Sequence, residues 1–198
     1  MYKSKLDIMQ TERMVKFLKT VFEAELSSAL NLSRISAPLF VTKESGLNDN
    51  LNGVERPVSF DVKATGKVVE VVHSLAKWKR YALAKYGFER GSGLYTDMNA
   101  IRRDEELDNL HSIYVDQWDW ERIMEPEERT LDYLKDTVRK IVFAVRSTER
   151  TLHSMYPALN QLPTLEPDIT FITTQELEDL YPDLTPKERE NTFLREHH

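Results

Sequence analysis

Apolar side chains recur along the first part of the chain with the spacing of a helix and then with that of a strand. Over residues 11–30 they lie three and four positions apart, which places them on one helix face, and Thr11 is a suitable N-cap. Residues 34–41 favour a strand. Pro38 interrupts it and has no N–H to donate to a ladder, so we expect Pro38 at a sheet edge or boundary.

The next stretch is predicted to form a loop, a hairpin and a helix. Glycine, asparagine and proline mark a loop over residues 44–56, and residues 58–63 and 67–72 have the composition of paired strands. Residues 74–86 have helical spacing. We expect this helix to bury Leu75, Trp78 and Leu83. Lys77, Lys79 and Arg80 are expected elsewhere on it, and three cations within four residues most often form a solvated face.

A charged hairpin is predicted in the middle of the chain. Residues 94–101 mix β-forming and small side chains, residues 102–109 make a polar turn, and residues 111–120 alternate in polarity. This alternation places Ile113 and Val115 on one face and Tyr114 and Asp116 on the other.

The hairpin carries opposite charges. Arg102 lies at its base, and the returning strand holds Asp116, Gln117 and Asp119. A guanidinium matches a phosphate or carboxylate, whereas the acids and the amide match an ammonium group, so the arrangement suits a zwitterionic, phosphate-bearing ligand. The alternative is a hairpin held by cross-strand ion pairs.

The second half of the chain is predicted to be largely helical. Residues 125–156 form the longest helical pattern, with Pro126 in its first turn and Pro157 ending it. Its apolar face consists of Leu131, Leu134, Val138, Ile141, Val142 and Val145.

Shorter elements follow this helix. Residues 169–173 favour a short strand, and residues 174–180 a helix with Thr174 as its N-cap. A last helix has Thr185 as its cap and Pro186 at its first position.

Composition bounds the class of protein. The 198 residues are 40% apolar and 30% charged, which is typical of one globular domain, and the net charge of −6 argues against nucleic acid or an anionic membrane as partner. No apolar run approaches the roughly 18 residues of a membrane span. Cysteine is absent and the N-terminus lacks the apolar core of a signal peptide, so we expect a cytoplasmic protein.

Several long words of the sequence resemble a known family. They are NDNLNG (48–53), HSLAKWKR (73–80), GLYTDMNAIR (93–102), HSIYVDQWDWER (111–122) and QELEDLYPDL (175–184). They are similar to ammonia-dependent asparagine synthetase of the A type, also called aspartate–ammonia ligase, whose fold is that of class II aminoacyl-tRNA synthetases. The resemblance implies an α+β fold, with an antiparallel sheet flanked by helices, over a single catalytic domain of residues 1–198.

The resemblance also implies what is missing and how the chain assembles. Members of the family are longer, and a Gly-rich motif 3 with a second ATP-clamping arginine has no counterpart here, so we expect the fold to be incomplete at the C-terminus. The first helix and the strand containing Pro38 resemble motif 1, which implies a homodimer. The residues alone favour the alternative that this helix packs on its own sheet.

The family reaction has two steps. The β-carboxylate of L-aspartate attacks the α-phosphate of Mg²⁺-bound ATP, giving β-aspartyl-adenylate and pyrophosphate, and ammonia then displaces AMP to give L-asparagine. A carboxylate lacks a good leaving group, and adenylation supplies one. Positioning and charge neutralisation therefore make up the enzyme's task, with no nucleophilic side chain needed.

The resemblance carries catalytic roles to three residues. Arg102 would grip the α-phosphate and the attacking carboxylate, Lys79 would pair with a substrate carboxylate, and the loop residue Asp49 would engage ammonium. The alternatives are an ion pair of Arg102 with Asp104 or Glu105, a solvated lysine, and a turn aspartate bonded to its own backbone.

The remaining site residues bind substrate or nucleotide. Gln117 and Asp119 would recognise the amino group of aspartate, and His73 and Ser74 would line the same pocket. The nucleotide-binding residues would be Arg102, Glu105, His111 and Ser112. Asp116 faces away from Gln117 and is expected to be structural, and Trp118 and Trp120 are expected in the core. Mg²⁺ is implied with ATP, and no metal ligand is assigned here.

Two other interpretations stay open at this point. One is an inactive fragment that keeps the dimerising half of the family fold. The other is a relative of aspartyl-tRNA synthetase that adenylates a different amino acid, which the acidic net charge disfavours as a user of tRNA.

Overall fold

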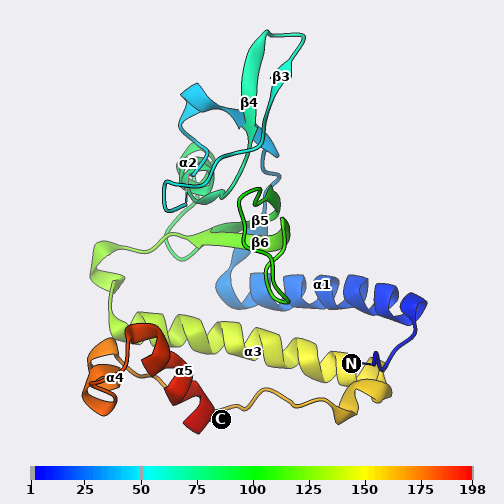
Figure 1. The fold of residues 1–198 in the computed structure, drawn as a ribbon, viewed down its shortest axis with the longest axis vertical. Coiled ribbons are helices and arrows are strands. Elements are labelled where there is room, and N and C mark those ends of the chain that lie inside the picture. Colours follow the sequence, from blue (N-terminus) through cyan, green and yellow to red (C-terminus); the bar gives the residue numbers. More distant parts are fainter. Residues whose placement is uncertain (1–2, 50, 198) are drawn as a thin grey trace. The chain divides into compact units, whose positions relative to one another are not determined.

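The computed structural model describes residues 3–49 and 51–197. They form two compact units, Met1–Pro163 and Thr164–His198, and Figure 1 traces the elements of both. The interpretation of residues 1–198 as one catalytic domain stays a prediction.

Two long helices lie side by side in the first unit and run in opposite directions (Figure 1). The first, α1 (Ile8–Leu30), begins three residues earlier than predicted, because Asp7 and not Thr11 is its N-cap. The Asp7 side chain accepts a hydrogen bond from the backbone N–H of Gln10, and the Gln10 side-chain oxygen accepts one from the backbone N–H of Asp7, so this capping box satisfies two donors at the helix start.

The second long helix, α3 (Leu131–Met155), begins six residues later than predicted. A short 3₁₀ turn (Pro126–Glu128) uses Pro126, and the Thr130 side chain then accepts the hydrogen bond that caps α3. The predicted apolar face is confirmed only in part: Ile141 packs against the cluster that contains Leu26 and Leu30 of α1. Leu131 and Leu134 of the predicted face are 66% and 54% exposed, and the buried residues of α3 are Ala144, Thr148 and Leu152.

One sheet of the first unit has the strand order β1–β5–β6. The short β1 (Leu32–Arg34) is parallel to β5 (Gly93–Ile101), and β5 is antiparallel to β6 (Tyr114–Arg122) over nine residue pairs. The β5–β6 pair is the predicted charged hairpin, although β6 begins three residues later than expected.

The single strand predicted over residues 34–41 was wrong. The chain leaves the first sheet after β1 and enters a second sheet as β2 (Phe40–Thr42), with Pro38 in the connection. A residue without an N–H suits that boundary.

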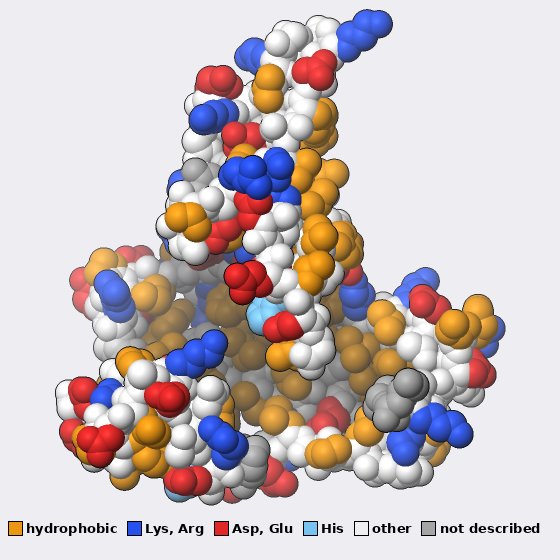
Figure 2. Space-filling model, in the orientation of Figure 1, with side chains coloured by type: hydrophobic (Ala, Val, Ile, Leu, Met, Phe, Trp, Pro, Cys, Tyr) orange, Lys and Arg blue, Asp and Glu red, His pale blue; other side chains and the backbone are white. Residues whose placement is uncertain are grey.

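The second sheet contains the predicted hairpin. Its order is β2–β4–β3, and β4 (Lys67–Val71) pairs antiparallel with both β2 and β3 (Ser59–Val62). The rings of Phe40 and Phe60 meet edge to face at 5.2 Å, and hydrophobic side chains gather along one flank of this sheet (Figure 2).

Two apolar clusters lie on opposite faces of the β5–β6 hairpin. One lies under α2 (Ala76–Lys85) and the other under α1 and α3. The α2 cluster consists of Val72, Leu75, Trp78, Ala82, Leu83, Leu94, Met98 and Ala100, and the other of Leu26, Leu30, Leu32, Tyr95 and Ala144. The burial predicted for Leu75, Trp78 and Leu83 is confirmed.

The second unit is helical. Residues 169–173, predicted as a strand, have no ladder partner within the part of the chain that the structure describes. Helix α4 (Thr174–Leu180) is capped by Thr173 and not by Thr174, in a capping box with Glu176. Helix α5 (Pro186–Glu196) follows Thr185 as predicted. No helix among the described residues has the length and apolarity to cross a membrane.

Gly93 offers a test of the packing between the strands. A Cβ at this position would lie 2.3 Å from the carbonyl oxygen of Glu121 and 2.8 Å from a methyl group of Leu32. We expect Gly93→Ala to lower the free energy of unfolding by about 2–3 kcal/mol, measured by urea denaturation. As a control, Gly66→Asn sits in open space in a turn that asparagine tolerates. An equal loss in both variants would contradict this packing.

Candidate active site

Arg102 lies where β5 ends, at the base of the hairpin. Its backbone N–H donates to the carbonyl of Ile113 at 2.7 Å, which fixes the start of the turn. Among the described residues, its side-chain Nε is buried without a hydrogen-bond partner. It borders a cavity of about 70 Å³, lined by Leu51, Glu55, Arg56, His73, Arg102, Arg103, Asp104 and Glu105.

The ion pair expected as the alternative role of Arg102 is not formed with Asp104. Asp104 is bound instead by Arg56, through the backbone N–H at 3.0 Å, Nε at 3.1 Å and Nη2 at 2.5 Å. These hydrogen bonds lower the pKa of Asp104 to about 2. The clamp fastens the loop before β3 to the turn after β5, and it leaves Arg102 uncommitted.

His73 enters the same cavity from the segment that precedes α2. It is 1% exposed, and its backbone N–H donates to Oδ1 of Asn48 at 2.9 Å. Asn48 in turn donates to Glu70 at 3.1 Å, which ties the loop to β4. His73 Nδ1, like Arg102 Nε, is buried without a partner among the described residues. Sequence reasoning gave Asn48 no role, although the NDNLNG word contained it.

Lys79 is buried, so the alternative of a solvated lysine is wrong. Its side chain is 2% exposed, whereas those of Lys77 and Arg80 are 50% and 71% exposed, as predicted for these two. The Lys79 ammonium forms an ion pair with Asp119 and donates to the carbonyl of Trp120 at 3.2 Å. Lys79 lies on the face of α2 that packs on the sheet, so it is buried although its side chain is charged.

The strand register brings Gln117 and Asp119 to the α2 side of the sheet. They pair with Met98 and Thr96, and Gln117 donates to the Met98 sulfur at 3.5 Å. The alternate residue Asp116 faces α1 and pairs with Lys19, as expected of a structural residue. Trp118 and Trp120 pack against the cluster under α1, partly buried.

The Lys79–Asp119 pair is complementary to a zwitterion. A carboxylate could replace Asp119 at the ammonium, and an ammonium group could replace Lys79 at the carboxylate. Without a ligand the two side chains satisfy each other, which keeps a buried cation paired.

Four predicted residues lie outside both the Arg102 cavity and the Lys79–Asp119 pair. Asp49 Oδ1 is 3.9 Å from Lys77 Nζ, and Ser74 Oγ accepts from the backbone of Ala76 at 3.2 Å. His111 and Ser112 are exposed in the hairpin turn, bonded respectively to Asp108 at 2.9 Å and to the backbone of Tyr114 at 3.3 Å. Of the predicted residues, the 70 Å³ cavity thus gathers Arg102, His73 and Glu105.

Comparison with known proteins decides the family. The family model described as aspartate-ammonia ligase matches residues 9–198. The chain belongs to the aspartate–ammonia ligase family. It is 62% identical to the aspartate–ammonia ligase of Ruminiclostridium cellulolyticum over 196 residues, covering 98% of this chain and 58% of the relative. For that of Bacillus cytotoxicus the identity is 58% over 197 residues, covering 100% of this chain and 60% of the relative.

Solved structures show the same fold. Asparaginyl-tRNA synthetase of Entamoeba histolytica superposes with a TM-score of 0.55 over 89% of this chain and 37% of that protein, at 12% identity. Its complex with asparaginyl-adenylate gives 0.52 over 92% and 40%, also at 12% identity. The expected class II synthetase fold is confirmed, and so is the expectation that this aspartate–ammonia ligase chain spans only part of the length of its relatives.

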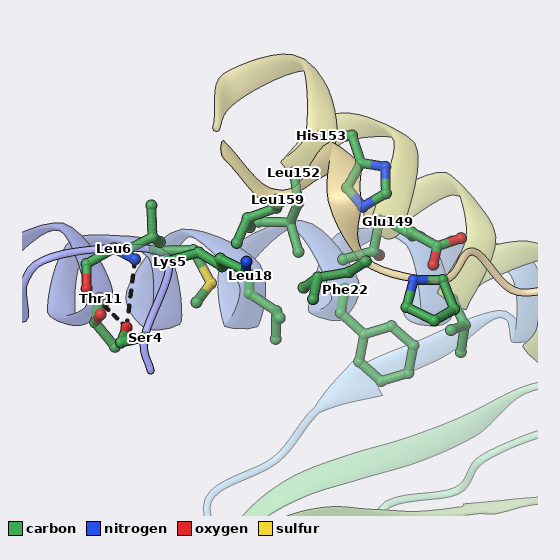
Figure 3. A pocket seen from close by; sticks show the side chains of 15 residues that line it. Ser4, Lys5, Leu6, Thr11, Leu18, Phe22, Glu149, Leu152, His153 and Leu159 are labelled. Atoms are coloured by element: carbon green, nitrogen blue, oxygen red, sulfur yellow. Dashed lines mark hydrogen bonds between the residues drawn. The ribbon is translucent and has the colours of Figure 1, made fainter. Parts of the chain in front are cut away.

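Two further features of this ligase-family chain bear on its site. No group of three or more His, Asp or Glu side chains able to hold a metal ion occurs among the described residues. A larger apolar cavity of about 650 Å³ lies between α1 and α3, where Leu18, Phe22 and Leu152 line it (Figure 3). None of the predicted site residues borders it.

Loss of Lys79 is expected to destabilise the fold. Lys79→Met keeps the apolar stem but leaves the Asp119 carboxylate without its cation, which we expect to cost about 2 kcal/mol because Asp119 is partly solvated. Urea denaturation followed by tryptophan fluorescence measures the loss. Lys77→Met, whose side chain is half exposed, is the control, and we expect it to change stability by less than about 0.5 kcal/mol. Equal losses would contradict the burial of Lys79.

The hydrogen bonds from Arg56 to Asp104 can be tested by titrating the Asp104 carboxyl group. The pKa of Asp104 is lowered to about 2, first through the side-chain hydrogen bond from Arg56. A depressed pKa means that the stabilisation is present above the ordinary carboxyl range and is lost as pH falls toward 2. We expect Arg56→Ala to return the pKa of Asp104 to the ordinary range of an aspartate, measured by carboxyl ¹³C NMR. An unchanged titration would show that the clamp does not form in solution.

Proposed function

We propose that this chain carries the N-terminal half-site of an enzyme that amidates L-aspartate with ammonia, using ATP. The observation that carries the proposal is the Nε of Arg102, which is buried without a hydrogen-bond partner among the described residues, in a segment that resembles the family (93–102). Burial without a partner costs free energy, and a phosphate or carboxylate oxygen would recover it.

The first step is adenylation. An oxygen of the aspartate β-carboxylate attacks the α-phosphorus of ATP, the P–O bond to pyrophosphate breaks, and the acyl-adenylate forms. Arg102 would neutralise charge on the phosphate and the attacking carboxylate. Lys79 would bind a carboxylate of aspartate, and Gln117 and Asp119 its amino group, so the ligand would separate the present Lys79–Asp119 pair.

The second step is amide formation. The nitrogen of ammonia attacks the activated carbonyl carbon, the C–O bond to AMP breaks, and the nitrogen loses a proton. Asp49 would attract ammonium and accept that proton, after leaving its weak contact with Lys77.

The remaining assignments belong to the same proposal. Glu105 and His73 border the cavity of Arg102, and Ser74 follows His73. His111 and Ser112, in the exposed turn, would reach the nucleotide. Mg²⁺ would bind mainly through the phosphates of ATP. We infer a homodimer in the cytoplasm, and the resemblance of α1 and the following segment with Pro38 to motif 1 supports the dimer.

The test is a calorimetric titration of this chain with AMP and with asparagine. We expect binding of both, and we expect Arg102→Ala to weaken AMP binding about tenfold or more, because a charge-assisted hydrogen bond contributes about 1.5–3 kcal/mol. Arg13→Ala, an exposed arginine of α1, is the control and should leave binding unchanged.

Two outcomes would contradict the proposal. One is binding of neither ligand by a chain that circular dichroism shows to be folded, which would favour an inactive fragment. The other is equal AMP affinity for Arg102→Ala and the unaltered chain.

A further inference from the structure

A third buried atom without a partner lies beside Arg102 and His73. It is Oε2 of Glu55, and no hydrogen bond reaches it from the described residues. Glu55, Arg102 and His73 all border the 70 Å³ cavity. Buried polar atoms without partners are rare in native proteins, so three around one cavity indicate a shared partner.

The chemistry of the three atoms defines that partner. Arg102 Nε can only donate a hydrogen bond and Glu55 Oε2, as a carboxylate oxygen, can only accept one, whereas His73 Nδ1 can do either. A molecule that accepts from Arg102 and donates to Glu55 satisfies both. A cavity of about 70 Å³ has room for roughly two waters, and a water can both donate and accept, so a water suits both atoms.

Glu55 is held in place by its neighbour. The backbone N–H and the guanidinium of Arg56 both bind Asp104, so the chain at residue 55 is fastened to the turn that follows Arg102. The same clamp occupies Asp104, the acid nearest to Arg102 in the turn. Glu55 is therefore a carboxylate at the Arg102 cavity with a buried oxygen that no described residue satisfies.

We propose that Glu55 is a positioning residue for Arg102. Through a bridging water it holds the Nε side of the guanidinium, so that the remaining N–H groups face a phosphate or carboxylate ligand. The identity of that ligand rests on the proposed function, whereas the contact between Glu55 and Arg102 belongs to the free chain.

The contact is tested without any ligand. In a ¹⁵N–¹H spectrum of the chain, the Arg102 Nε–H signal is assigned by its loss in Arg102→Lys. We expect Glu55→Gln, which keeps the shape and removes the charge, to shift this signal and to speed its exchange with water. Glu44→Gln, an exposed glutamate of the same loop region, should leave it unchanged. An Arg102 signal that Glu55→Gln does not move would overturn the proposal.

A double-mutant cycle on AMP binding tests the positioning role. We expect Glu55→Gln to weaken AMP binding three- to tenfold in the unaltered chain and to have no further effect in Arg102→Ala. An equal loss in both backgrounds would mean that Glu55 acts independently of Arg102, and would overturn the proposal. If AMP does not bind but Glu55→Gln still moves the Arg102 signal, the positioning contact stands and the proposed function fails.

Discussion

The nine-residue ladder between β5 and β6 sets the sheet face on which each charged side chain of β6 lies. Side chains alternate across a strand, so the register that faces Gln117 and Asp119 toward α2 also faces Asp116, Trp118 and Trp120 toward α1. A slip by one residue would exchange the two sets, placing Asp119 against the apolar cluster under α1 and the two tryptophans under α2. Apolar clusters on both faces hold this register, and the ion pairs of Lys79 and Lys19 lie one on each face.

The Lys79–Asp119 pair and the residues around the Arg102 cavity differ in how their buried polar atoms are satisfied. Lys79 and Asp119 neutralise each other inside the fold. Arg102, His73 and Glu55 carry buried polar atoms that no described residue satisfies, although charged side chains lie close by. The clamp between Arg56 and Asp104 contributes to this difference, because the Asp104 carboxylate lines the same cavity but is bound by Arg56 and not by Arg102.

Local signals in the sequence were enough for much of the fold. Period-two alternation predicted the hairpins, and the spacing of apolar residues predicted the helices; their errors lie at the ends, where capping by Asp7, Thr130 and Thr173 depends on side-chain geometry. Two errors have a longer-range cause. The strand predicted after α1 is divided between two sheets, and the first part of the apolar face predicted for α3 is exposed, because partners distant in sequence decide both.

The site residues could be predicted where they lie in sequence segments that resemble the family. They could not be predicted where tertiary packing decides which side chain is buried. Lys79 shows the limit, since three cations in four residues indicate a solvated face and only the packing of α2 on the sheet reveals which of them is buried. Asn48 and Glu55 show another limit. Asn48 donates to Glu70, 22 residues further along the chain, and Glu55 has a buried oxygen without a partner near Arg102. No local sequence pattern indicates either feature.

The burial of Lys79 links the stability of this fold to its proposed chemistry. A zwitterionic ligand must break the Lys79–Asp119 pair and replace both halves, so its net affinity is the difference between new contacts and an interaction that already exists. Selectivity follows from the same constraint. A ligand with only a carboxylate would leave the partly solvated Asp119 without a cation, at a cost of about 2 kcal/mol, and a ligand with only an ammonium group would leave the buried Lys79 unpaired, at a larger cost. The pair therefore favours ligands that carry both charges at the right separation, before any contact with Arg102 is made.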